Sequence, residues 1–168
     1  NINQLDFGKK ADLSFELNTD NIDLEKLKVA TIPLSEVLDF NQGVITGNNK
    51  EFITNVSSSN TKKVITGSDF NRYSINWPKV YIIYDESKLH RPRKKIVFEA
   101  SEKILLRQTA SYPIASYDNE QFYTLDTVHN GLSKNNEFNL KYFVALLNSK
   151  LFRYLYTSSI NEEGKVFA

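Results

Sequence analysis

The sequence contains no cysteine and no methionine, and only 2 of its 168 residues are histidine. Without cysteine the chain can form neither disulfides nor thiolate zinc sites, and it offers no thiol nucleophile. Two histidines also leave little basis for an imidazole-rich metal site. Because a natural start codon encodes methionine, we expect the sequence to be either a piece of a larger protein or a processed form.

Long apolar runs are also absent. The longest span a few residues, as at Phe143–Leu147, whereas a membrane span needs roughly 18. The N-terminus lacks the basic-then-apolar pattern of a signal peptide. We therefore expect a cytoplasmic protein that is not held by a membrane. Hydrophobic residues make up 40% of the chain and aromatic residues 12%, enough to build a packed core.

The net charge of +1 conceals an uneven distribution. Residues 61–108 carry eleven Lys and Arg against five Asp and Glu, whereas residues 1–60 have a net charge of −4 and residues 109–168 one of −1. The cations are densest in residues 88–95, which we call the basic run. Such a run is typical of a protein that binds a polyanion. The alternative is a solvated loop whose charges keep the protein soluble.

Hydrophobic periodicity predicts an α+β fold in a single domain, residues 1–168, whose first 30 residues are partly a linker. A helix is expected at residues 23–29 and a short helical turn at residues 34–38. Strand-length apolar segments occur at residues 63–67, 80–85, 104–109, 114–118 and 122–128. Because these segments are short and separated by turn residues, they predict a mixed, mostly antiparallel sheet.

The C-terminal part of the chain changes to helical spacing. Leucine, valine and phenylalanine recur at that spacing from Leu140 onward. Asn139 is the expected N-cap. Asn148 and Ser149 interrupt the helix-forming residues, so a bend is expected there, with Ser149 capping a second helical segment.

Catalytic motifs are missing. There is no Asn-Pro-Pro-Tyr loop, no dinucleotide-binding glycine pattern and no phosphate loop. Glu86-Ser87-Lys88, with Asp69 upstream, has the form found in Mg²⁺-dependent nucleases, but such a short pattern often arises by chance. His90 and His129 are residues of a kind more often structural than catalytic. We therefore expect no enzyme activity and no cofactor in this segment by itself.

A loop over residues 43–49, with glycines at positions 43 and 47, is the first candidate for contact with DNA. Asparagine and threonine can pair with base edges, and glycine permits close approach. The candidate residues of this loop are Thr46, Asn48 and Asn49. The alternative interpretation is a tight structural turn.

Three further segments carry side chains suited to DNA. Arg107 favours guanine and Gln108 favours adenine, although neighbours on a strand face opposite sides. Arg72 could contact a phosphate with Tyr73 beside it. The alternative is that Asp69 caps a turn and pairs with Arg72 while Tyr73 fills the core. The basic run is better suited to anchoring phosphates than to reading bases, because lysine lacks bidentate geometry. Its candidate residues are Arg91, Arg93, Lys94 and Lys95.

The order of five segments resembles the TaqI-like C-terminal specificity domain. They are residues 43–49, 67–73, 81–85, 103–109 and 147–151, and the resemblance covers about residues 34–165. Phe70 stands where that family commonly has isoleucine. The family is found in N6-adenine DNA methyltransferases and fused restriction-methylation enzymes of type IIG. It is similar in role to the target recognition domains of type I restriction specificity subunits.

The resemblance implies a division of labour in a restriction-modification system. An upstream catalytic domain would transfer a methyl group from S-adenosylmethionine, and this domain would choose the sequence of double-stranded DNA. Two other functions stay open at this point. One is a nuclease or methyltransferase fragment that retains part of its active site. The other is a protein-interaction module that docks on a catalytic partner.

Overall fold

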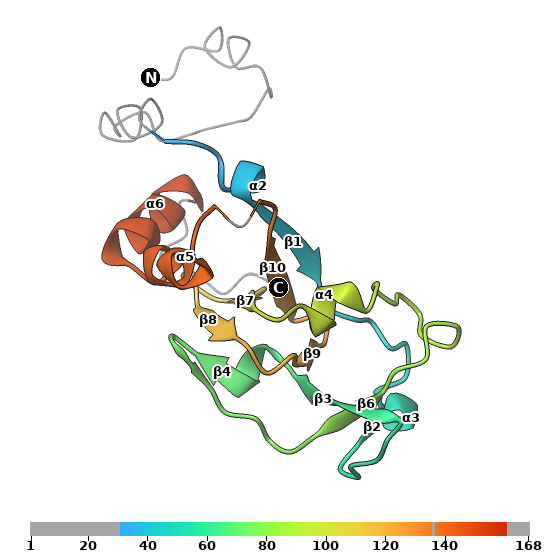
Figure 1. Ribbon diagram of the computed structural model, residues 1–168. Helices are drawn as coiled ribbons and strands as arrows, with labels where there is room; N and C mark the ends of the chain where they lie inside the picture. Colours follow the sequence, from blue (N-terminus) through green and yellow to red (C-terminus); the bar gives the residue numbers. More distant parts are fainter. Residues whose placement is uncertain (1–30, 136, 161–168) are drawn as a thin grey trace, which may run out of the picture.

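The computed structural model describes residues 31–135 and 137–160, so the helix expected at residues 23–29 lies outside the described part. Short strands, interrupted in a few places by short helices, make up most of the described chain, and two longer helices follow at the end (Figure 1). In chain order the elements are α2 (Leu34–Val37), β1 (Leu38–Gln42), α3 (Asn49–Phe52), β2 (Ile53–Thr54), β3 (Thr61–Ile65), the 3-10 turn η2 (Gly67–Asp69), β4 (Phe70–Asn71), β5 (Ser74–Ile75), β6 (Tyr81–Ile83), α4 (Ile96–Glu99), β7 (Lys103–Arg107), β8 (Ala115–Asp118), β9 (Tyr123–Thr124), β10 (Val128–Ser133), α5 (Leu140–Leu147) and α6 (Lys150–Ile160).

The first sheet has the strand order β1-β10-β7-β8, and every neighbouring pair is antiparallel. Ile104 and Leu105 of β7 are both fully buried, although adjacent residues of a strand face opposite sides of the sheet. Ile104 packs in a cluster with α5, whereas Leu105 packs in another with Ile65 and Phe70. The sheet is therefore covered on both faces at its centre.

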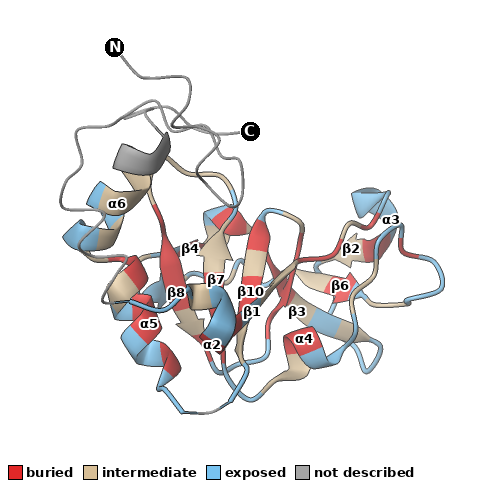
Figure 2. Cartoon of the chain, turned by 90° about the horizontal axis from the view of Figure 1, so that it is seen from above, coloured by how far each residue is buried: buried red, intermediate tan, exposed pale blue. Residues whose placement is uncertain are grey.

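The two C-terminal helices confirm the expected caps and bend. The Asn139 side chain accepts a hydrogen bond from the first turn of α5 at 2.9 Å, and Ser149 Oγ accepts one from the first turn of α6 at 3.0 Å. The buried amide of Asn148 donates to the carbonyl of Ala115 at 2.8 Å and accepts from its N–H at 2.9 Å. Figure 2 shows α5 beside β8, with α6 leaving the sheet at this point. These two hydrogen bonds to β8 thus hold Asn148 in place and fix the point at which α6 begins.

The second sheet has the strand order β2-β6-β3-β9, in which only β3 and β9 are parallel. An aromatic group fills its core: the rings of Phe98 and Tyr123 stack with centroids 4.6 Å apart, and Tyr84 meets Tyr123 edge-on at 4.9 Å. Val64 and Ile82 pack in the same cluster. Burying one large apolar side chain stabilises a fold by about 1.5–3 kcal/mol. Such a core compensates for the shortness of β2, β6 and β9, which have only two or three residues each.

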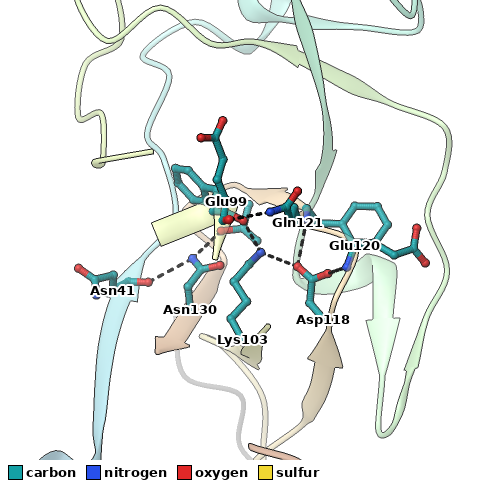
Figure 3. A network of polar contacts seen from close by, with 10 residues as sticks. Asn41, Glu99, Lys103, Asp118, Glu120, Gln121 and Asn130 are labelled. Atoms are coloured by element: carbon teal, nitrogen blue, oxygen red, sulfur yellow. Dashed lines mark hydrogen bonds and ion pairs between the residues drawn. The ribbon is translucent and has the colours of Figure 1, made fainter. Parts of the chain in front are cut away.

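A buried ion pair connects the first sheet to α4 (Figure 3). Lys103 on β7 and Asp118 on β8 are both completely buried, with Nζ and Oδ2 2.6 Å apart. Lys103 Nζ also donates to the Phe98 carbonyl of α4 at 2.8 Å. Burial lowers the pKa of the Lys103 amine, and the charge of Asp118 opposes this effect. Because α4 begins directly after the basic run, the contact also fixes the end of that run.

The α+β class, the short and mostly antiparallel strands and the C-terminal helical segment are confirmed. The strands are distributed over two four-stranded sheets and the two-stranded pair β4-β5. Within the described residues, no helix has the length and apolar character needed to cross a membrane.

One expected strand is divided in the structure. Residues 122–128 form β9, a turn, and the first residue of β10, and the Val128 N–H donates to the Leu125 carbonyl at 3.1 Å across the turn. The division has a physical cause, because β9 pairs with β3 of the second sheet whereas β10 pairs with β7 of the first. A single straight strand could not satisfy both partners.

Candidate nucleic-acid interface

The loop that follows β1 is held against the β9–β10 turn. A Cβ atom on Gly43 would lie 2.1 Å from the Leu125 carbonyl oxygen, so only glycine fits there. The next residue, Val44, donates its N–H to the Thr124 carbonyl at 2.8 Å. Gly47 then takes a left-handed conformation, with φ of 83°. The two glycines thus set the path of the loop, as the structural-turn interpretation requires.

The same loop lines an open pocket of about 570 Å³, whose walls are residues 44–50 and Asp126. Thr46 is only 5% exposed, and its hydroxyl donates to Asn49 Oδ1 at 2.5 Å. Asn48 and Asn49 have exposed side chains, and Asn48 Nδ2 lies 3.5 Å from Glu51 Oε2. The pocket therefore presents the amides of Asn48 and Asn49 to solvent, and the buried Thr46 fixes that of Asn49 by a hydrogen bond.

The basic run lies directly beside this loop. The N–H of Arg91 donates to the Ile45 carbonyl at 2.9 Å, and the Ile45 N–H donates back to Arg91 at 3.3 Å. Farther along, the Arg93 N–H donates to the Tyr84 hydroxyl at 2.9 Å, and that hydroxyl donates to the Arg93 carbonyl. Burial raises the pKa of Tyr84, so its hydroxyl keeps the proton that it donates. The run is pinned along its backbone and is not a freely moving chain.

The four candidate cations of the basic run divide into two groups. Arg93 is half-buried, and its Nε donates to the Gln42 carbonyl at 2.9 Å. Arg91, Lys94 and Lys95 are exposed. Arg93 therefore helps to fix the end of β1, while the other three cations face solvent.

Gln42 connects Asp126 of the pocket to Gln108. Its Nε2 donates to the Asp126 carbonyl at 3.1 Å and to Gln108 Oε1 at 3.4 Å. Gln108 is exposed and lies just beyond β7, where its N–H donates to the Thr127 carbonyl at 3.0 Å. Gln42 thus places Gln108 next to the turn that carries Asp126, at one wall of the pocket.

Arg107 points to a different neighbour from Gln108, in agreement with their expected opposite faces. Its guanidinium donates to the Phe70 carbonyl and lies 3.4 Å from Asn71 Oδ1. The guanidinium carbon is 5.7 Å from the centre of the Phe70 ring. Arg107 is therefore partly engaged in holding β4.

Arg72 and Tyr73 occupy the tight connection between β4 and β5. Tyr73 is 62% exposed, with φ of 66°, so the interpretation that it fills the core is wrong. Asp69 does cap a turn, since its carboxylate accepts from the Thr66 N–H at 2.7 Å. It does not pair with Arg72. The guanidinium carbon of Arg72 lies instead 4.6 Å from the centre of the Tyr112 ring. The reason is geometric, because the capping bonds turn Asp69 toward Thr66.

Two residues in or beside the pocket were not foreseen from the sequence. Gln42 is the polar end of a strand that the hydrophobic pattern did not show, and Asp126 falls inside a segment expected to be one strand. The pair Asp126-Thr127 within an apolar segment was the available signal, since polar residues there indicate a turn.

The alternative of a nuclease centre gains no geometric support. Lys88 pairs with Asp85 at 3.4 Å, whereas no pairing with Glu86 of the expected motif is present in the described part of the chain. Asp69 is engaged in its turn. Among residues 31–135 and 137–160, no three histidine or acidic side chains are grouped as metal ligands. His129 is half-buried, and desolvation lowers its pKa.

Comparison with known proteins gives one positive result. The family model of the TaqI-like C-terminal specificity domain matches residues 62–168, more than half of the chain. The matched range runs from β3 through α6 and includes the basic run, whereas the pocket loop precedes it. No curated protein matches the chain.

Proposed function

Because the chain belongs to the family of TaqI-like C-terminal specificity domains, we propose that it selects the DNA sequence on which a restriction-modification enzyme acts. A specificity domain is by itself non-catalytic. The parent enzyme in this proposal is an adenine-specific DNA methyltransferase, with or without endonuclease activity as in type IIG enzymes. Its upstream catalytic domain would bind S-adenosylmethionine, and the present domain would bind double-stranded DNA.

The observation that carries the proposal is the joining of the pocket loop to the basic run. Residues suited to bases and residues suited to phosphates come from separate parts of the sequence, and backbone bonds between Ile45 and Arg91 place them side by side. Recognition of DNA needs both, since phosphate contacts position a protein while base contacts specify the sequence. A solvated loop would need no such attachment.

We assign base reading to the exposed amides and to Arg107. Asn48, Asn49 and Gln108 can each offer a donor and an acceptor to adenine in the major groove, and Arg107 can offer two donors to guanine. In this assignment Thr46 positions Asn49.

Phosphate binding is assigned to the cations that face solvent. Arg91, Lys94 and Lys95 would contact the DNA backbone beside the pocket, with Arg93 fixing the strand that carries Gln42. Arg72 and Tyr73 would contact the backbone from the β4–β5 connection.

A selection from randomised duplexes tests the base-reading assignment. The 168-residue chain should enrich one sequence, and replacing Asn48, Asn49, Arg107 or Gln108 singly by alanine should relax one or two base positions. Losing a bidentate contact costs about 1–3 kcal/mol of discrimination. Asn119→Ala is the matched control, because it removes an exposed amide away from the pocket. The salt dependence of binding should stay the same in all these variants.

Three results would contradict the proposal. An unchanged preferred sequence in all four variants would place the reading surface elsewhere on the domain. Failure of the chain to bind any duplex at low salt would argue against DNA recognition altogether. DNA methylation or cleavage by the pure chain that is lost in Glu86→Ala would support the catalytic alternative.

A further inference from the structure

Two arginines meet on one tyrosine ring, that of Tyr112. The guanidinium carbon of Arg72 lies 4.6 Å from the centre of the Tyr112 ring, and that of Arg153 lies 4.4 Å from it. The three residues come from the β4–β5 connection, the β7–β8 connection and α6. The fold therefore assembles this cluster from segments that are far apart in the sequence.

The charges of this cluster are not neutralised within the part of the chain that the structure describes. Neither Arg72 nor Arg153 forms an ion pair there, and neither guanidinium donates a hydrogen bond to another described residue. The two distances to the ring place the guanidinium carbons no more than 9.0 Å apart. Two like charges at this separation are only partly screened at physiological salt, where the Debye length is about 8 Å. The arrangement thus favours an anion that both guanidinium groups can reach.

The donors of both side chains remain available to such an anion. A guanidinium has five N–H groups in a rigid fork that matches the oxygens of a phosphate. The aromatic ring attracts each cation and orients it. Tyr112 thus restricts two side chains that would otherwise lose conformational entropy on binding.

The cluster continues the proposed DNA surface. Arg107 reaches Asn71, which immediately precedes Arg72, and Arg107 is adjacent to Gln108 at the pocket. We propose that Arg72 and Arg153, carried on the ring of Tyr112, bind one backbone phosphate of the DNA duplex. This inference rests on the proposed function, to which it adds Tyr112, Arg153 and the helix α6. It assigns phosphate binding because two neighbouring cations match the negative charge of a phosphate, whereas a base edge carries no charge.

A double-mutant cycle on the 168-residue chain tests this inference. Binding to two duplexes of unrelated sequence is measured for Arg72→Gln, Arg153→Gln and the double variant, across a series of salt concentrations. Each single variant should weaken binding by about tenfold, as expected for loss of a hydrogen bond to a charged group. The double variant should be little weaker than either, because one phosphate is shared. The slope of log affinity against log salt should flatten by about 0.9 for the loss of one phosphate contact.

Two further variants and a control complete the design. Tyr112→Phe keeps the ring and should bind like the unaltered chain, whereas Tyr112→Leu should weaken binding to a similar extent as the double variant. Lys150→Gln removes one exposed charge from the start of the same helix and should change affinity by less than about twofold, since it is outside the shared site. Thermal melting of each variant checks that the fold is kept.

The outcomes separate this inference from the function on which it rests. If the unaltered chain binds DNA and the double variant matches it in affinity and slope, the phosphate site is refuted while DNA recognition stands. Additive losses would mean that the two arginines act separately and would refute the shared site. A loss that differs between the two duplexes would indicate base reading and would also overturn it. If the unaltered chain binds no duplex, the proposed function itself fails.

Discussion

Neutralising the exposed cations of the basic run should weaken DNA binding by an amount that the structure lets us estimate. Arg91 is attached to the neighbouring loop through backbone atoms, so changing its side chain leaves that attachment in place. Lys94 and Lys95 are exposed. Arg93 is different because its side chain holds the Gln42 carbonyl at 2.9 Å. The perturbation is therefore the triple variant Arg91→Gln, Lys94→Gln and Lys95→Gln, with Arg93 retained.

The expected size follows from counterion release. Each phosphate contact contributes about 0.9 to the slope of log affinity against log salt, so losing three contacts should flatten that slope by about 2.7. When the salt is raised from 50 to 200 mM, the factor by which the affinity falls should therefore be about 40-fold smaller for the triple variant than for the unaltered chain. Because phosphates carry no sequence information, the effect should be equal for unrelated duplexes.

Fluorescence anisotropy with labelled duplexes, measured at several salt concentrations, gives the slope directly. The matched control is the triple variant Lys79→Gln, Lys141→Gln and Lys150→Gln, which removes three exposed charges outside the basic run. An unchanged slope in the first triple variant would show that the run is merely solvated. Equal flattening in both would show a general effect of net charge and would refute the assignment of contacts.

Three predictions concern the scaffold. Gly43→Ala places a Cβ atom 2.1 Å from the Leu125 carbonyl oxygen and should lower the free energy of unfolding by about 1–3 kcal/mol, as overpacking does; urea denaturation that shows no loss would contradict the close approach. Lys103→Met leaves the buried Asp118 carboxylate without its partner and should cost about 3–5 kcal/mol, and a loss below about 1 kcal/mol in the same assay would be inconsistent with a buried pair. Burial and the hydrogen bond to Glu99 raise the pKa of Tyr123 above its ordinary 10.0, so the unfolded chain ionises first and stability should fall as the pH rises above 10. Tyr123→Phe should reduce this dependence in urea titrations at pH 8 and 10.5, and an identical dependence in both proteins would refute the assignment.

Local signals in the sequence were sufficient for the C-terminal helices. A cap needs only one side chain and the N–H groups two or three residues later, so Asn139 and Ser149 could be recognised from neighbouring residues alone. The strongest apolar segments likewise gave β6, β7 and β8 to within one or two residues. What these signals omitted was the role of Asn148, whose amide bonds to Ala115 across the fold.

Features that depend on distant partners could not be predicted in this way. β1 is largely polar, and its strand conformation comes from pairing with β10, about ninety residues later. One of the two interpretations of Arg72 paired it with the nearby Asp69, because the sequence shows only neighbours. In the structure that carboxylate caps its own turn and the arginine lies on Tyr112. Composition correctly located the basic run but could not show that it is attached to the pocket loop.

The attachment of the basic run has a consequence for binding. Tyr84 and Ile45 hold its backbone, and just beyond it the bond from Lys103 fixes α4. Ordering one residue of a free chain costs about 1–2 kcal/mol, and a run that is already held at both ends avoids much of that cost when it meets DNA. If the proposed function is correct, the buried ion pair and the aromatic core contribute to recognition as well as to stability. They keep the exposed cations of the basic run at a set position relative to the amides of the pocket, so that in the proposed function contact with the DNA backbone would also align those amides with the bases.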